Sequence, residues 1–179
     1  SIANLIRQEF GDDAERLFEL YPGLENGAST AQTELLGDSM FGDKAYFYAT
    51  RHAVSGESSY LYYFNQTSPL KKQTAGAFHA SEIAYVFGSE ISILPIDDDG
   101  RDLSKQMSRY WRNFAHNGDP SDNELSAWPA YQKDSDQWMV LGKKVGLLTI
   151  EKKEKYEILI RRLSRELASL VSGRPKEIG

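Results

Sequence analysis

Residues 76–88 read GAFHASEIAYVFG, and this segment says more about the chain than any other. It carries His79, one of three histidines in the sequence. A polar loop separates it from residues 59–64, whose dense aromatic side chains are typical of a β-strand. In an open α/β sheet, the loops beyond the carboxyl ends of the strands carry the chemistry. We therefore expect an α/β fold with His79 as a candidate functional residue.

The composition of the 179 residues is that of a globular domain with a hydrophobic core, since 40% are hydrophobic and 26% are charged. The formal net charge of −5 offers no broad basic surface for nucleic acid. No apolar run approaches the ~20 residues of a membrane helix, and no signal peptide is visible. We therefore expect neither a nucleic-acid partner nor a membrane span.

The sequence contains no cysteine, which excludes thiol catalysis, a disulfide framework and a cysteine-based zinc site. This absence favours a cytoplasmic protein over a disulfide-stabilised secreted one, without fixing the compartment. The three histidines lack the paired spacing of metal ligands. Residues 97–99 are three aspartates, which we expect to form a solvated turn and not a calcium site, because no EF-hand pattern follows them. The sequence predicts no metal site.

Hydrophobic periodicity and turn-forming residues predict helices and three short strands. The expected helices cover residues 2–10, 12–21, 29–54, 81–87, 102–117 and 156–172, and the expected strands cover residues 59–64, 137–141 and 146–150. We expect the first strand to be buried on both faces and Asp102 to cap the helix that follows it. Ser29 and Gln32 match a capping box. No internal repeat or interdomain linker is visible.

Several motifs, in order along the chain, share the pattern of one enzyme family. The matching residues are Asp38 and Phe41; Gly76, His79, Glu82, Val86 and Phe87; Trp111, Asn113, Phe114, Ala115, Gly118, Asp119 and Pro120; Trp128, Pro129 and Tyr131; and Trp138 to Leu141. From about Leu36 to Ile150, the chain resembles the type B carboxylesterase and cholinesterase family. Its lack of cysteine is similar to bacterial members such as the para-nitrobenzyl esterases. Ser81 stands where the family often has an acidic residue, a departure that concerns local hydrogen bonds and not the match of His79.

The resemblance implies the C-terminal part of an α/β-hydrolase fold, with the last sheet strands and their packing helices. The family's catalytic serine lies in a G-x-S-x-G turn between a strand and a helix. The nearest string, GESSY at residues 56–60, has Tyr60 in place of the last glycine, so we expect Ser58 to be a turn residue. The resemblance places the acid and the oxyanion loop upstream of Ser1. Residues 1–179 would then be the C-terminal portion of a carboxylesterase domain, without its nucleophile-bearing portion.

His79 is the predicted catalytic base. A serine hydroxyl is a weak nucleophile until a base takes its proton, and imidazole can accept and return a proton near neutral pH. By resemblance, His79 would accept the serine proton, protonate the leaving alcohol and then activate water. Phe78 would line the acyl or alcohol pocket or pack in the core, and the sequence leaves both readings open.

Four other polar residues have mainly structural interpretations. His52 and His116 are expected near helix ends, as surface residues or helix C-terminal partners. Glu82 could in principle be the catalytic acid, but a helix start there favours a role as an N-terminal helix charge. Asp38 is expected to make a buried structural hydrogen bond.

The function that the resemblance implies is hydrolysis of carboxylic esters through an acyl-enzyme, with no cofactor. The partners would be the remainder of the same polypeptide and a small-molecule ester, and the last helix could support a homodimer. This chain alone is expected to be inactive, with apolar surface exposed where upstream strands pack. Two alternatives stay open: a non-catalytic adhesion-type binding protein on the same fold, and an independent helical interaction module.

Overall fold

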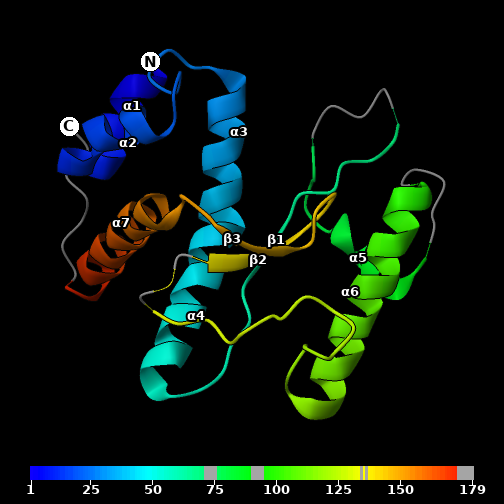
Figure 1. The fold of residues 1–179 in the computed structure, drawn as a ribbon. Coiled ribbons are helices and arrows are strands. Elements are labelled where there is room, and N and C mark those ends of the chain that lie inside the picture. The colour runs from blue at the N-terminus through cyan, green and yellow to red at the C-terminus, as the bar shows by residue number, and fades with distance from the viewer. Residues whose placement is uncertain (71–75, 90–94, 134, 136, 173–179) are drawn as a thin grey trace. The chain divides into compact units, whose positions relative to one another are not determined.

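The computed structural model describes residues 1–70, 76–89, 95–133, 135 and 137–172 (Figure 1). The chain divides into two compact units, each with its own buried residues. Unit 1 is formed by Ser1–Arg51 together with Glu151–Gly179, and unit 2 by His52–Ile150. The first and last segments of the chain therefore build one unit together.

Unit 1 is helical. Its elements are α1 (Ile2–Phe10), the 3-10 turn η1 (Gly11–Asp13), α2 (Ala14–Leu20), α3 (Ser29–Gly37), the π-helical turn η2 (Asp38–Gly42), α4 (Asp43–Ser55), whose last turn extends into unit 2, and α7 (Lys153–Val171). The first helix has the predicted bounds and ends at Gly11, whose φ of 57° is readily adopted by glycine. The second helix and the last helix also lie where the periodicity predicts them.

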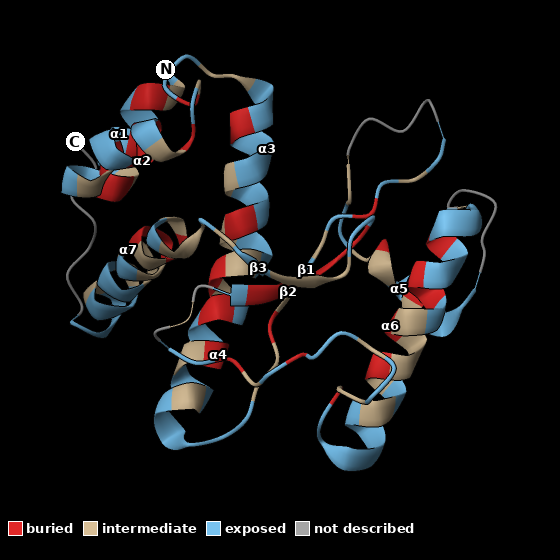
Figure 2. Ribbon diagram, viewed as in Figure 1, coloured by how far each residue is buried: buried red, intermediate tan, exposed pale blue. Residues whose placement is uncertain are grey.

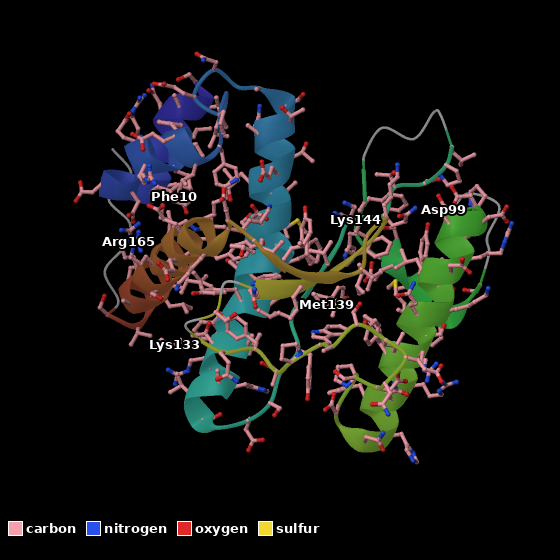
Figure 3. All side chains as sticks on the ribbon, viewed as in Figure 1. Phe10, Asp99, Lys133, Met139, Lys144 and Arg165 are labelled. Carbon is pink, nitrogen blue, oxygen red and sulfur yellow. The ribbon has the colours of Figure 1, made fainter. Side chains whose placement is uncertain are left out.

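Ion pairs join α7 to the N-terminal helices of unit 1. Arg161 Nη2 lies 2.8 Å from Asp13 Oδ1, and Arg162 Nη1 lies 2.5 Å from Glu9 Oε1. Arg165 Nη2 donates to the carbonyl oxygen of Phe10 at 3.0 Å, and both residues are marked in Figure 3. Asp13 directly precedes α2, where an aspartate can cap a helix, but its carboxylate makes no cap hydrogen bond and pairs with these arginines instead. The hydrogen bond from Arg161 lowers the pKa of Asp13.

The long helix predicted over residues 29–54 exists as two α-helices joined by η2. Gly37 and Gly42, which weaken a regular helix, stand directly before η2 and at its end. The predicted capping box is wrong: Ala28 occupies the cap position, and Gln32 Nε2 donates to the carbonyl of Gly27 at 2.7 Å. The chain thus continues in one helical path, with a wider turn in its middle.

Unit 2 contains a three-stranded sheet and two helices. Its elements are β1 (Tyr62–Phe64), α5 (Glu82–Phe87), α6 (Asp98–Asn117), β2 (Gln137–Leu141) and β3 (Gly146–Thr149). The strand order is β1-β2-β3, with β1 and β2 parallel and β2 and β3 antiparallel. Tyr62 pairs with Met139, and Phe64 pairs with Leu141. Parallel strands need a long crossover, and the segment with α5 and α6 supplies it. This is a partial α/β fold, as expected.

The core of unit 2 lies between the sheet, α5 and α6. Met139, marked in Figure 3, is fully buried on the central strand β2. Figure 2 shows buried and exposed positions alternating around α6, with Leu103, Met107 and Tyr110 on its buried stripe. Phe114 continues the same apolar spacing, but it is 50% exposed because it lies in the last turn of the helix, where the packing ends.

Two further expectations about these elements are wrong. The first strand is only three residues long, and Tyr63 is 36% exposed, because β1 is at the edge of the described sheet. The sixth helix begins at Asp98 and not after Asp102: Asp97 Oδ1 accepts from the Gly100 N–H at 2.8 Å and caps it. In α7 the buried side chains, those of Tyr156, Ile158 and Leu159, lie in the first half of the helix, and Leu167 is exposed.

None of the helices among the described residues is both long and apolar enough to cross a membrane.

Candidate active site

His79 occupies a tight turn in the crossover that follows β1. The Ser81 N–H donates to the carbonyl oxygen of Phe78 at 3.0 Å and closes this turn, with His79 and Ala80 at its two central positions. Ala80 has a φ of 67° and is the one non-glycine residue with positive φ among those described. A positive φ at the third position is the geometry of a type II turn, which normally carries glycine there. The predicted base therefore sits on a strained backbone.

The turn presents its first two side chains to the outside. His79 is exposed, as a base that must reach a substrate requires. Phe78 is 38% exposed, so the core-packing reading of this residue is wrong. Phe78 and Ser81 border a small hollow of about 10 Å³ beside Gln66 and Tyr85. The part of Phe78 in substrate binding stays a prediction.

Glu82 begins α5 and lies in its first turn, as expected of an N-terminal helix charge. Burial raises the pKa of Tyr62 to about 12, and the negative charge of Glu82 adds to this effect. Tyr62 is therefore a neutral phenol at neutral pH and is not a candidate base.

The other histidines and the elbow-like string have structural positions. His52 and His116 are exposed and stand in the last turns of α4 and α6, as predicted. Ser58 is exposed in the loop between α4 and β1, so the string at residues 56–60 precedes a strand and does not link a strand to a helix. No group of three or more acidic or histidine side chains suited to a metal ion occurs within the described part of the chain.

Asp38 forms a buried polar cluster, the structural role that the sequence favours. Its carboxylate accepts from Lys152 Nζ at 2.9 and 3.0 Å and from the Tyr21 hydroxyl at 2.9 Å. The Tyr156 hydroxyl lies 3.4 Å from Asp38 Oδ1. Burial, together with the charge of Asp38, raises the pKa of Tyr21 far above its ordinary value. These contacts tie η2 to α2 and α7 and belong to the scaffold of unit 1.

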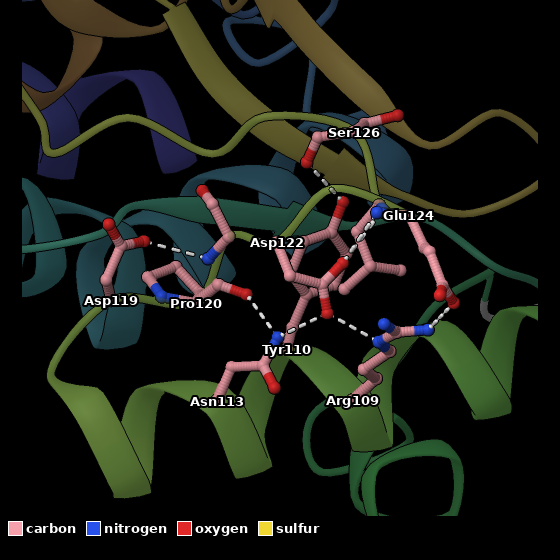
Figure 4. A network of polar contacts seen from close by, with 10 residues as sticks. Arg109, Tyr110, Asn113, Asp119, Pro120, Asp122, Glu124 and Ser126 are labelled. Carbon is pink, nitrogen blue, oxygen red and sulfur yellow. Dashed lines mark hydrogen bonds and ion pairs between the residues drawn. The ribbon is translucent and has the colours of Figure 1, made fainter.

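A second polar network fixes the loop after α6 (Figure 4). Asp122 Oδ2 accepts from Arg109 Nε at 2.5 Å and from Asn113 Nδ2 at 2.8 Å. Asp122 Oδ1 accepts from the N–H groups of Glu124 at 2.9 Å and Leu125 at 3.1 Å. Desolvation opposes the charge on Asp122, but the hydrogen bonds from Asn113, Glu124 and Arg109 outweigh it and lower its pKa to about 2.

The same loop contains the motif of Trp128, Pro129 and Tyr131, and it places Trp128 in an aromatic cluster. Trp128 is buried, and its ring meets those of Tyr110 and Tyr62 edge to face, at 5.2 and 6.1 Å between centroids. Ser121 Oγ donates to the Trp128 carbonyl at 3.1 Å and accepts from its N–H at 2.9 Å. The cluster borders a cavity of about 200 Å³. The tryptophan motif thus joins α6 to the sheet that positions the His79 segment.

The sequence predicts a functional role for His79 but gives no sign of three structural features described above. The left-handed backbone at Ala80 has no sequence signal, since alanine usually avoids it. The double hydrogen bond of Ser81 to Phe78 depends on that backbone and is equally hidden. The hydrogen bonds to the Asp122 carboxylate also have no sequence signal, because their donors lie at irregular spacings in α6 and in the loop.

Comparison with known proteins gives consistent results. A model of the Carboxylesterase family matches residues 15–159. Carboxylesterase 4A of Bos taurus is 36% identical over 124 residues, which cover 67% of this chain and 22% of that protein. A solved PNB esterase superposes with a TM-score of 0.67 at 28% identity, and a thermophilic PNB esterase with 0.68 at 25%; each match covers 88% of this chain and 32% of the other. The chain spans about a fifth to a third of the length of these relatives.

Proposed function

The chain belongs to the carboxylesterase family, as the match over residues 15–159 shows, and from that premise we propose that it supplies the catalytic histidine of a serine esterase. The whole polypeptide would hydrolyse carboxylic esters through an acyl-enzyme, without a cofactor. Residues 1–179 would form the C-terminal portion of its α/β-hydrolase domain. The catalytic serine, the acid and the oxyanion donors would come from the rest of the polypeptide.

The observation that carries the proposal is the placement of His79. It is exposed on a strained turn that follows the parallel strand β1, the place where α/β sheets hold reacting groups. Backbone strain of this kind is concentrated at functional sites. In the proposed mechanism, the imidazole takes the serine proton as the hydroxyl attacks the ester carbonyl. It then gives that proton to the departing alcohol, and it activates water to release the acid.

Exposed apolar side chains support the presence of a further packing partner. In unit 1, the segment from α3 to α4 exposes five large apolar residues, which are Leu36, Met40, Phe41, Phe47 and Tyr48. The sequence pattern places Leu36, Met40, Phe41 and Tyr48, with Ala45, on one side of the helix predicted over residues 29–54, and unit 1 does not cover these four large side chains. Exposed large apolar side chains of this kind can mark an interaction surface. We assign it to the remainder of the esterase polypeptide.

The test is ester hydrolysis by the full-length polypeptide that carries this sequence, with a chromogenic short-chain ester as substrate. His79→Ala should lower kcat by several orders of magnitude while the protein stays folded. His116→Ala is the matched control, because it removes another exposed histidine of unit 2 and should keep full activity. Equal loss in both variants, or activity in His79→Ala equal to wild type, would overturn the assignment. An inactive wild-type polypeptide on a broad panel of esters would favour a binding function instead.

A further inference from the structure

The turn that carries His79 depends on an unfavourable backbone conformation. Ala80 adopts a φ of 67°, which an alanine side chain disfavours because its Cβ approaches the following carbonyl. Such a conformation persists only where surrounding contacts hold it in place. The residues beside Ala80 must therefore supply that restraint.

Ser81 supplies the restraint from both its backbone and its side chain. Its N–H and its Oγ both donate to the carbonyl oxygen of Phe78, at 3.0 and 2.6 Å. Ser81 is only 4% exposed, so water cannot easily replace these bonds. The second bond fixes the direction of the Phe78 carbonyl, and with it the peptide that leads into His79. A backbone N–H alone would leave that carbonyl with one partner instead of two.

The turn is also attached to a well-anchored helix. The Ile83 N–H donates to the carbonyl of Ala80 at 3.2 Å, which continues the turn into α5. In turn, Ser104 Oγ and Ser108 Oγ on α6 donate to the carbonyls of Tyr85 at 2.7 Å and of Val86 at 2.6 Å. The turn is thereby anchored through α5 to the core of unit 2. Ser81 lies between α5 and His79 and connects them.

We infer that Ser81 is a positioning residue for His79: its hydroxyl holds the left-handed turn that aims the imidazole at the reacting serine. This inference rests on the proposed function. Ser81 does not touch substrate. It acts by keeping the base in one orientation, and displacements of about 1 Å in a reacting group can cost ~100-fold in rate.

The experiment compares Ser81→Ala, Ser81→Thr and His79→Ala in the full-length esterase, with kcat, KM and the melting temperature measured for each. Ser81→Ala should lower kcat by about tenfold to a hundredfold with KM nearly unchanged, because binding of the ester does not require an aligned base. Ser81→Thr keeps the hydroxyl and should restore kcat to within about threefold of wild type.

Ser121→Ala is the matched control. Ser121 is a partly buried serine of unit 2, and its hydroxyl likewise bonds a backbone carbonyl, that of Trp128. Its replacement should lower the melting temperature about as much as Ser81→Ala does, with kcat unchanged. A purely structural role of Ser81 would make the two variants alike in kcat as well.

The outcomes separate the two proposals. If His79→Ala abolishes turnover while Ser81→Ala turns over like wild type, His79 remains the base and the inference on Ser81 is wrong. If His79→Ala is fully active, the proposed function itself fails. If Ser81→Ala does not fold, the Ser81→Thr variant decides: a kcat near that of wild type supports the hydroxyl as the restraint, and a kcat as low as that of His79→Ala contradicts it.

Discussion

Asp122 shows how much a single side chain can organise. Its two carboxylate oxygens receive four hydrogen bonds, two from side chains of α6 and two from the N–H groups of its own loop. Charge-assisted bonds of this kind are about twice as strong as neutral ones. The loop after α6 is therefore fixed in one shape, and it brings Trp128 into the aromatic cluster of unit 2.

The low pKa of Asp122 predicts how the free energy of unfolding changes at acid pH. The pKa is about 2 in the folded protein, against about 3.9 for an ordinary aspartate. The carboxylate thus stabilises the folded state fully above pH ~4, and this contribution is lost as the pH falls toward 2. Urea unfolding at a series of pH values should show wild type more stable than Asp122→Asn at pH 7, by a margin that shrinks between pH 4 and pH 2.

Asp102→Asn is the control for this titration, because Asp102 is an exposed residue of α6 whose carboxylate pairs with the exposed Lys105. Its margin against wild type should be small at every pH. A margin for Asp122→Asn that is constant down to pH 2 would contradict the assigned pKa.

At the level of elements, the π-helical turn η2 is where unit 1 is assembled. It breaks the helical path between α3 and α4, and it places Asp38 against Lys152 and Tyr21. Turns of this type are often found at sites with a special demand on the backbone. Here the backbone at Gly42 must approach the ring of Tyr156 closely, since a Cβ added to Gly42 would lie 2.6 Å from a ring carbon of Tyr156.

The two glycines beside and within this turn should respond in opposite ways to the same substitution. Gly42→Ala forces a methyl group into the buried ring of Tyr156 and should lower the free energy of unfolding by about 1–3 kcal/mol. Gly37→Ala meets no atom within 4 Å in a helical position and should raise it by about 0.5–1 kcal/mol. Guanidinium unfolding of both variants measures these values. Equal effects would show that Gly42 does not hold the contact with Tyr156.

The elements that the sequence predicted well are those with a local cause. The bounds of α1 and β2 follow from apolar spacing and flanking turn residues, and both match. The start of α6 was missed because Asp97 and Asp102 are both acceptable caps, and only the fold selects Asp97. The edge position of β1 and the left-handed backbone at Ala80 depend on distant parts of the chain, so neither has a local pattern. The motif containing His79 could be found from sequence, whereas the geometry that holds it could not.

For the molecule as a whole, the important fact is that unit 1 is discontinuous and unit 2 is not. Lys152 and Tyr156 reach Asp38, and Arg161 reaches Asp13, so the last helix completes the core and the ion pairs of unit 1. All three tryptophans, in contrast, lie in unit 2. The two units can therefore be followed by separate signals.

A chain that ends at residue 150 should lose the structure of unit 1 and keep that of unit 2. We expect a fall in far-UV circular dichroism larger than the loss of α7 alone, because α1 and α2 lose their packing partner. Near-UV circular dichroism from the tryptophan cluster should persist. The control is Leu167→Gln with Leu170→Gln, which alters two exposed residues of α7 and should change neither signal. Loss of the near-UV signal on truncation would show that unit 2 cannot fold without unit 1.

The discontinuity of unit 1 also has a consequence for the newly made chain. On the ribosome, α1 to α3 emerge before unit 2, but α7 follows only after roughly a hundred residues of unit 2 have been added. At ~5–20 residues per second, this delay is about 5–20 s, far longer than a helix needs to form. During that interval the carboxylate of Asp38 has no Lys152, and the apolar faces of α1 and α2 remain uncovered. The nascent polypeptide therefore offers a chaperone a binding window at α1 and α2, which closes when translation reaches α7.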